Sequence, residues 1–199
     1  MLSGRFLCPG DRVPELLDLL GPDEKIDVHL IGDSAVELPT DPRVIVRAVE
    51  LRSGVMTERP CYVEGVPPSQ LVGRGVFGKV RCGGVRIPSV EEVASYVIEA
   101  ARFSLPFKGT AGMHAAVRGW ESTNGIPHHG YLNLLLAVSR ALSADDVKAV
   151  LASTDADLLA EEAREMSTDL VTATRWLFHS YGSCDTVRPV TDALHLGLL

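Results

Sequence analysis

Two short apolar segments of this sequence carry pairs of polar side chains spaced two residues apart. Lys79 and Arg81 lie in one segment, and Lys108 and Thr110 lie in the other. Because side chains alternate across a β-strand, each pair would point to one face. A buried lysine beside other cations has a lowered pKa, which suits it to polarise a carbonyl or form a Schiff base, while arginine binds carboxylate and phosphate. These residues therefore predict a site for an anionic, carbonyl- or phosphate-bearing compound.

Further ionisable side chains interrupt neighbouring apolar segments, namely His29, Glu50 and Glu64. If all of them face one interior, acids and bases can neutralise one another there, which is the least costly way to bury charge. We expect either Glu64 or His114, further along the chain, to move the proton, and His29 and Glu50 to support the site. The alternative is a buried ion-pair network that only fills the interior, a task that Val, Ile and Leu usually perform.

Glycines accompany both charged pairs. Gly83 and Gly84 follow the first pair, and Gly109 lies inside the second. Glycine lets backbone N–H groups approach an anion closely, although the same residues would also suit tight turns with a positive φ. The predicted anion-binding residues are Lys79, Arg81, Gly83, Gly84, Gly109, Thr110 and Arg118.

His114 and Arg118 lie four residues apart after the second segment. In a helix they would share a face close to Lys108, and the neighbouring cations would lower the pKa of His114, which suits a neutral base. The predicted catalytic residues are therefore Lys108, His114 and Glu64.

The pair His128-His129 could supply a ligand or a proton shuttle, or it could lie in a solvated loop. With Asn133, His129 completes the secondary candidates. No H-E-x-x-H motif, P-loop, nucleophile elbow or dinucleotide fingerprint is present, so we expect neither a metal nor a cofactor. The four cysteines are too scattered for a zinc site and are expected to be reduced, at positions Cys8, Cys61, Cys82 and Cys184.

Short apolar runs bounded by Gly, Pro or Asp alternate with helical patterns along the chain. The expected strands are residues 4–8, 26–31, 44–51, 61–66, 76–82 and 105–110. A helix is expected after the first strand, with Val13 and Leu16 on its apolar face, and another covers residues 131–142. The clearest helix follows Ser89, which forms a capping box with Glu92, and a further helix is expected to begin at Ser143.

Strands separated by helices imply parallel pairing and right-handed crossovers. We therefore expect one domain over residues 1–199, an incomplete (β/α)₈-barrel-like α/β fold with about seven strands or fewer. Active sites of such barrels lie at the carboxyl ends of the strands.

The composition narrows the class of protein. The 199 residues are 46% hydrophobic and 23% charged, which is typical of a globular domain, and the net charge of −7 disfavours nucleic acid and anionic membranes as partners. No segment predicts a membrane span or a signal peptide, so we expect a cytoplasmic protein.

Several motifs resemble those of a family of uncharacterised, barrel-like bacterial proteins. K-V-R-C-G-G at 79–84 is similar to the family pattern K-x-R-x-G-G, and F-K-G-T-A-G-M-H-A-A-V-R at 107–118 is similar to F-K-A-T-A-G-L-H-x-x-x-R. H-G-Y-L-N at 129–133 resembles H-G-F-L-N, and residues 181–199 resemble the family's ending F-G-S-C-S-F-x-E-P-x-x-D-L-x-x-L-G-L-L. The chain departs from these patterns at Gly109, Met113, Asp185 and Thr186.

Members of that family are typically longer at the N-terminus, so the resemblance implies that this chain lacks a first βα unit. It implies a fold and the placement of a site, but supplies no reaction. We expect an enzyme of lyase, aldolase or isomerase type. The alternative is a non-catalytic barrel relative that binds a metabolite or a partner protein. A missing strand would leave exposed sheet edges, so we expect a homo-oligomer that covers one of them.

Overall fold

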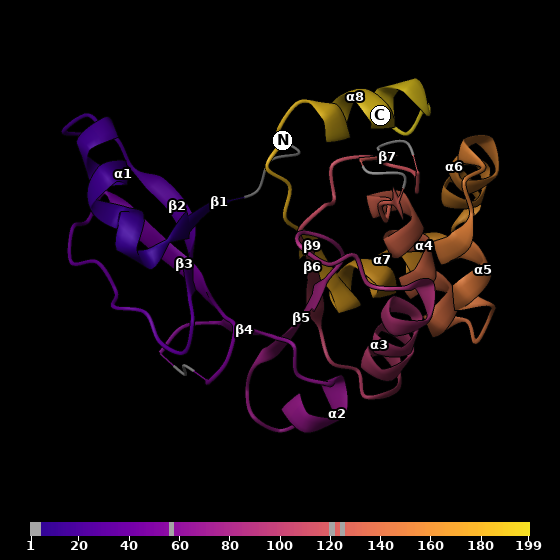
Figure 1. Cartoon of the computed structure of the whole chain (residues 1–199), viewed down its shortest axis with the longest axis horizontal. Helices are drawn as coiled ribbons and strands as arrows, with labels where there is room; N and C mark the ends of the chain where they lie inside the picture. Colours follow the sequence, from indigo (N-terminus) through magenta and orange to yellow (C-terminus); the bar gives the residue numbers. More distant parts are fainter. Residues whose placement is uncertain (1–4, 56–57, 120–121, 124–125) are drawn as a thin grey trace.

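The computed structural model describes residues 5–55, 58–119, 122–123 and 126–199. Its main element is one sheet of seven parallel strands in the order β1-β2-β3-β4-β5-β6-β9 (Figure 1). The strands are β1 (Phe6–Pro9), β2 (Ile26–Gly32), β3 (Val44–Leu51), β4 (Cys61–Glu64), β5 (Phe77–Arg81), β6 (Phe107–Thr110) and β9 (Phe178–Tyr181). The prediction of six parallel strands in chain order is confirmed, although Gly4, its first residue, lies outside the described residues. The seventh strand, β9, was not predicted.

Helices lie in four of the six connections between strands and cover much of the outer face of the sheet, whereas, in the part of the chain that the structure describes, β2 leads to β3 and β3 to β4 without a helix. The helices are α1 (Val13–Leu19), α2 (Pro68–Leu71), α3 (Val90–Arg102), α4 (Tyr131–Leu142), α5 (Val147–Ala152), α6 (Ala156–Glu165), α7 (Thr168–Leu177) and α8 (Arg188–His195). A single turn of 3₁₀-helix (Gly10–Arg12) precedes α1, and a two-stranded hairpin, β7 (Ser122–Thr123) and β8 (Ile126–Pro127), precedes α4. No helix among the described residues is long and apolar enough to cross a bilayer.

The helix boundaries follow local capping chemistry. The predicted capping box of α3 is present, because the Ser89 side chain accepts from the N–H of Glu92 and the Glu92 side chain accepts from the N–H of Ser89. The prediction that a helix begins at Ser143 is wrong. Ala144 has a left-handed φ of 57°, which ends α4, and Asp146 caps α5 by accepting from two backbone N–H groups.

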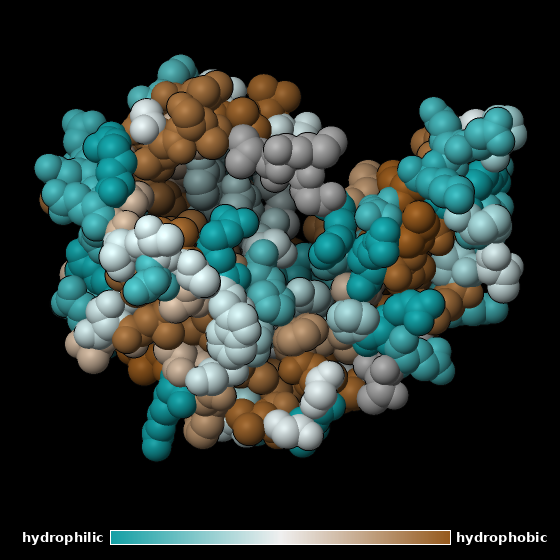
Figure 2. Space-filling view, turned by 180° about the vertical axis from the view of Figure 1, so that it is seen from behind, coloured by the Kyte–Doolittle hydropathy of each residue, from teal (hydrophilic) through white to brown (hydrophobic). Residues whose placement is uncertain are grey.

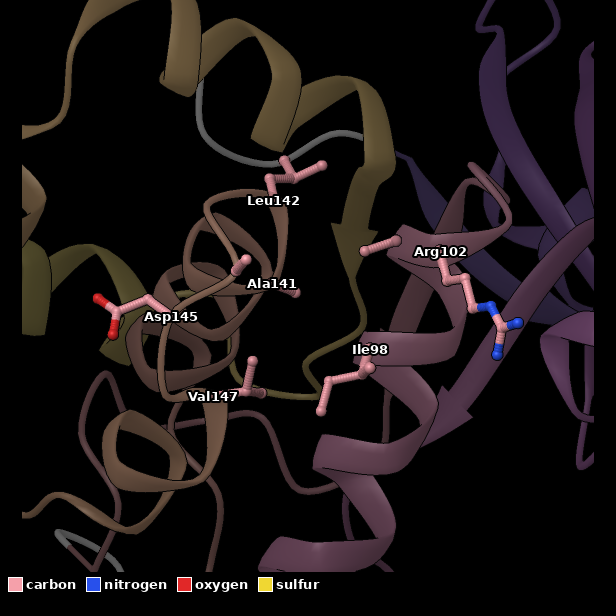
Figure 3. A pocket seen from close by; sticks show the side chains of 8 residues that line it. Ile98, Arg102, Ala141, Leu142, Asp145 and Val147 are labelled. Carbon is pink, nitrogen blue, oxygen red and sulfur yellow. The ribbon is translucent and has the colours of Figure 1, made fainter.

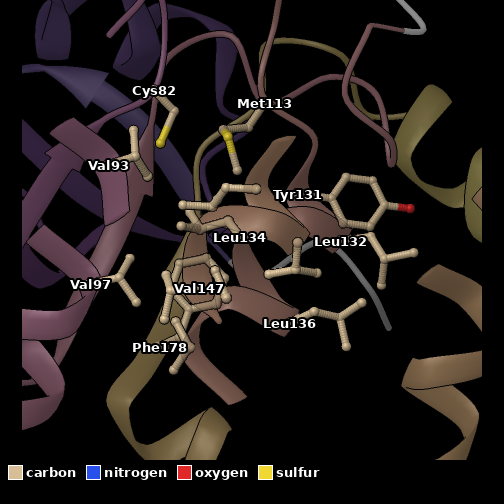
Figure 4. Packing of buried hydrophobic residues seen from close by; sticks show 14 of the residues in the cluster. Cys82, Val93, Val97, Met113, Tyr131, Leu132, Leu134, Leu136, Val147 and Phe178 are labelled. Carbon is tan, nitrogen blue, oxygen red and sulfur yellow. The ribbon is translucent and has the colours of Figure 1, made fainter. Parts of the chain in front are cut away.

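The largest core lies between the strands β5, β6 and β9 and the helices α3, α4, α5 and α7. Residues that alternate with the charged positions point into it, so that Val80, Phe107 and Phe178 belong to one buried cluster with Val97 and Leu134. Figure 4 shows Phe178 of β9 beside the side chains of the helices. Two smaller cores lie over β1 to β4, where α1, α2 and the segment containing Val36 and Leu38 supply the cover. One face of every strand is therefore apolar and covered, as in a barrel wall.

The other face is concave, because the sheet curls into a half-barrel. The hydroxyl of Tyr62 on β4 lies 2.8 Å from Nδ1 of His179 on β9, although two strands separate them in the sheet. In a flat sheet, strands three steps apart would be about 14 Å distant. The first three strands with α1 form one lobe, and β5, β6 and β9 with most of the helices form the other (Figure 1). Seen from behind, the surface is hollowed between these lobes (Figure 2).

Candidate functional site

Glu50 lies at the centre of a buried charged network on the concave face. Its Oε1 is 2.9 Å from Nδ1 of His29 on β2 and 2.5 Å from Nζ of Lys108 on β6. Its Oε2 is 3.2 Å from Nζ of Lys79 on β5. The curl of the sheet thus brings three separate strands to one carboxylate.

Lys79 extends the network toward the carboxyl ends of the strands. Its Nζ also lies 3.0 Å from Oε2 of Glu64, whose Oε1 accepts a hydrogen bond of 2.8 Å from Nε of Arg81. Within the described residues, Oε2 of Glu50 and Oε2 of Glu64 are buried without an aligned hydrogen bond. The two contacts of Lys79 are therefore ion pairs rather than well-directed hydrogen bonds, and both oxygens keep capacity to accept a proton donor.

The environment sets the protonation of these groups. Burial alone would raise the pKa of Glu50, but the bond to His29 and the charges of Lys108 and Lys79 outweigh it and lower the pKa to about 2. Burial likewise opposes ionisation of Glu64, yet Lys79 and Arg81 lower its pKa. The pKa of Lys108 is lowered, because the cost of burying its ammonium exceeds the attraction of Glu50. Glu50 and Glu64 therefore stay ionised, whereas the environment of Lys108 favours its neutral amine form more than water does.

The five ionised groups of this network do not balance. Three cations, Lys79, Arg81 and Lys108, face two carboxylates, so one positive charge is in excess. Arg5 adds a further cation at the edge, with Nη1 3.5 Å from Nε2 of His29. The two buried lysines balance the two carboxylates, so the surplus positive charge lies on the partly exposed Arg81, where it favours binding of an anion from solvent.

Aromatic side chains lie on the same face, one level nearer the amino ends of the strands. The ring of Tyr62 contacts the rings of Phe77 and His179, and Nζ of Lys108 lies 5.7 Å from its centre. Sequence reasoning missed Tyr62, although its two-residue spacing from Glu64 was the available signal. His179 was missed because its strand, β9, was not predicted; its neighbour Phe178 faces the core, so alternation places His179 on the concave face.

The predicted glycines have different surroundings from those expected. A Cβ at Gly109 would lie 2.9 Å from Cδ2 of Leu134, so this glycine faces α4 and not the charged network. A Cβ at Gly83 would lie 3.0 Å from Cα of Gly112, where the loops after β5 and β6 pack together. Gly84 has a φ of 98°, and a Cβ there would lie 2.8 Å from Nη1 of Arg81. Of the three, Gly83 and Gly84 lie beside the predicted anion-binding Arg81, whose Nη1 is 3.5 Å from the carbonyl oxygen of Gly83.

Thr110 lies beside Arg81 in the register of β5 and β6, on the face of Lys108. These two residues lie at the carboxyl ends of β5 and β6, two residues beyond Lys79 and Lys108. The predicted sharing of faces within both pairs is therefore observed.

The segment of His114 and Arg118 is not helical, so the condition for the two side chains to share a helix face is not met. Residues 111–119 form bends and a turn, and Ala111 and Gly112 have left-handed φ values of 61° and 69°. Nδ1 of His114 lies 3.0 Å from Oγ of Ser183, and its Nε2 lies 3.5 Å from Sγ of Cys184, both in the loop after β9. His114 is thus placed on the rim of the half-barrel by a neighbouring loop and not by a helix.

Arg118, His129 and Asn133 form a separate cluster on the helical side. Nη1 of Arg118 contacts Nδ1 of His129, whose Nε2 lies 2.8 Å from the carbonyl oxygen of Pro88. The Asn133 side chain accepts from the N–H of Arg118 and donates to the carbonyls of Val150 and Ser153. Its amide is fully engaged in joining the rim loop to α5, which is a structural role. The prediction that Arg118 converges with Lys79, Arg81 and Lys108 is therefore wrong.

A pocket of about 390 Å³ lies elsewhere, between the carboxyl ends of α3 and α4 (Figure 3). Both helices run back from the carboxyl ends of the strands, so this pocket lies at the opposite end of the sheet. The charged groups of Arg102 and Asp145 point away from each other there (Figure 3). Without converging polar groups it is a weaker candidate than the charged network.

Comparison of the chain with protein-family models, with curated proteins and with solved structures found no match. Within the described residues, no cluster of three or more His, Cys, Asp or Glu side chains is arranged to hold a metal ion. A function for this protein is therefore inferred from the charged residues of the concave face.

Proposed function

We propose that this protein is an enzyme acting on a small anionic metabolite that bears a carbonyl or phosphate group, with lyase, aldolase or isomerase chemistry. The observation that carries the proposal is the pairing of Lys108, which has a lowered pKa, with a Glu50 that stays ionised in a network with surplus positive charge. Simple filling of the concave face would require neither the surplus charge nor the perturbed amine.

In this proposal, Lys108 supplies the reacting amine. After its ammonium releases a proton to solvent, the neutral amine adds to the substrate carbonyl, and loss of water from the carbinolamine gives an imine. Lys79 and Arg81 attract the anion. The lowered pKa of Glu64 suits it to hold these cations in place rather than to accept a proton, so proton transfer is assigned to His114 on the rim.

Borohydride trapping tests this role. The protein is mixed with a carbonyl probe and sodium borohydride, which adds hydride to the C=N bond and leaves a stable secondary amine that mass spectrometry can locate. We expect the adduct on Lys108, its loss in Lys108→Met, and its retention in Lys148→Met, which removes an exposed lysine of α5.

A second candidate is a non-catalytic barrel relative that binds a metabolite or a partner protein. The near-complete burial of both lysines favours it, since Lys79 is 4% exposed and Lys108 is 2% exposed. A metabolite that raises the melting temperature without any trapped adduct would support this candidate over the enzyme.

We further propose that the protein self-associates through a sheet edge. Strands β1 and β9 end the order of the sheet, and the side chain of Phe6 on β1 is half exposed. Unpaired strand edges readily pair with another chain. We place the protein in the cytosol, where the buried thiols of Cys8, Cys61 and Cys82, which form no disulfide, would stay reduced.

A further inference from the structure

The charged network has two different ends. Lys108 pairs with Glu50, Arg81 pairs with Glu64, and Lys79 joins the two carboxylates. Lys108 and Arg81 thus contact different carboxylates, and each can bind a different group of one ligand.

Exposure rises steadily from one end of the network to the other. The side chain of Lys108 is 2% exposed, that of Lys79 5%, that of Glu64 12% and that of Arg81 44%. A ligand that enters from solvent therefore meets Arg81 first and reaches Lys108 last. Because the strands are parallel, this gradient also runs toward the carboxyl ends, where barrel sites open.

Arg81 keeps donors available at the open end. Its Nε is engaged with Glu64, while Nη1 makes only a long contact of 3.5 Å to the carbonyl of Gly83. Gly84 leaves room beside Nη1, and the hydroxyl-bearing Thr110 is the register neighbour of Arg81 on β6. A guanidinium with a free edge beside a hydroxyl and glycine backbone is suited to bind phosphate oxygens.

The register of β5 with β6 sets the separation between the backbone positions of Lys108 and Arg81, the two ends of the network. Lys108 on β6 lies opposite Lys79 on β5 in the register of the two strands, and Arg81 lies two residues beyond Lys79 on β5. Two residues of strand and one step between strands separate the backbone positions of Lys108 and Arg81 by about 8 Å. A ligand whose anionic group and carbonyl are spaced to match this separation would suit both residues better than a 2-keto acid, which carries its charge on the carbon next to the carbonyl.

Resting on the proposed function, we infer that the substrate is a phosphorylated aldehyde or ketone of about three to five carbons, with its phosphate at the far end from the carbonyl. Arg81 binds the phosphate at the mouth, and the carbonyl extends inward to Lys108. The surplus positive charge of the network offsets part of the charge of the phosphate.

The test compares borohydride trapping of glyceraldehyde 3-phosphate, glyceraldehyde and pyruvate. We expect the phosphorylated aldehyde to label Lys108 at least about tenfold faster than glyceraldehyde, because charge-assisted hydrogen bonds to phosphate are strong. In Arg81→Gln this ratio should fall toward one, and Arg81→Lys should restore part of it. Arg102→Gln, which removes an arginine at the opposite end of the molecule, should keep the wild-type ratio.

Each other outcome has a distinct meaning. Labelling of Lys108 without preference for the phosphorylated aldehyde, or a preference that survives Arg81→Gln in a folded variant, overturns this inference and leaves the proposed function intact. Absence of any adduct on Lys108 with all three probes overturns both. Denaturant unfolding of each variant checks that a changed ratio does not arise from unfolding.

Discussion

Nζ of Lys108 lies 2.5 Å from Oε1 of Glu50, although their strands, β6 and β3, are separated by β4 and β5. A flat sheet would hold these strands about 14 Å apart. The contact exists because the sheet curls, so the same long-range geometry that forms the half-barrel also forms the site.

Removal of Glu50 and removal of Lys108 should have unequal effects on stability. Lys108→Met leaves two cations facing two carboxylates, and we expect a loss of about 1 kcal/mol or less in the free energy of unfolding. Glu50→Gln leaves two buried cations, Lys79 and Lys108, with one carboxylate, Glu64, which also pairs with Arg81, and we expect a loss of about 3–5 kcal/mol. Urea unfolding measures both, and Glu15→Gln, which removes an exposed carboxylate of α1, should have little effect. If Lys108→Met proves the more damaging change, the charge balance inferred for the network is incorrect.

Acid should weaken the fold through Glu50. Its pKa falls from an ordinary 4.5 to about 2 in the folded protein. The folded state therefore binds fewer protons than the unfolded state, and this stabilisation is fully present above pH 4.5 and is lost as the pH falls toward 2. The difference corresponds to about 3 kcal/mol. Free energies of unfolding measured between pH 6 and pH 2 should show a shallower decline in Glu50→Gln than in the wild type, and equal slopes would contradict the assignment.

The bond between Tyr62 and His179 should contribute directly to the curl. The two side chains join β4 to β9 across the concave face at 2.8 Å. A double-mutant cycle of Tyr62→Phe and His179→Ala should give a coupling of about 1 kcal/mol in the free energy of unfolding, the usual value for one hydrogen bond. Additive single effects would show that the two side chains do not interact in solution.

The sheet edge should govern the oligomeric state. We expect light scattering to report a dimer or larger assembly for the wild type, and a shift toward monomer in Phe6→Lys, because charge on an edge strand opposes pairing. Leu19→Lys alters an exposed apolar residue of α1 and should leave the mass unchanged. A wild-type protein that is monomeric at all concentrations would exclude self-association through β1.

Local sequence patterns were sufficient for the first six strands of the sheet, for helices α1, α3 and α4, and for the faces of the strands, but they did not indicate β9 or helices α6, α7 and α8. Alternation of side chains placed Lys79 with Arg81 and Lys108 with Thr110 on one face, and the register of β5 with β6 has both pairs side by side. The capping box at Ser89 located α3, because its hydrogen bonds join residues three apart. Both patterns depend on neighbours within a few residues, so the sequence alone contains them.

Only the tertiary structure determined which side chains of the candidate site contact one another. The sequence did not indicate that one carboxylate, Glu50, would serve both Lys79 and Lys108, since that depends on the curvature of the whole sheet. It also did not indicate that His179 would meet Tyr62, because β4 and β9 are brought together only by the curl of the sheet. Arg118 was expected at the site and instead contacts His129, because left-handed residues at 111 and 112 turn the chain away from a helix. Faces follow from short-range alternation, whereas the meeting of charges across a curled sheet follows from packing and register between strands far apart in the chain.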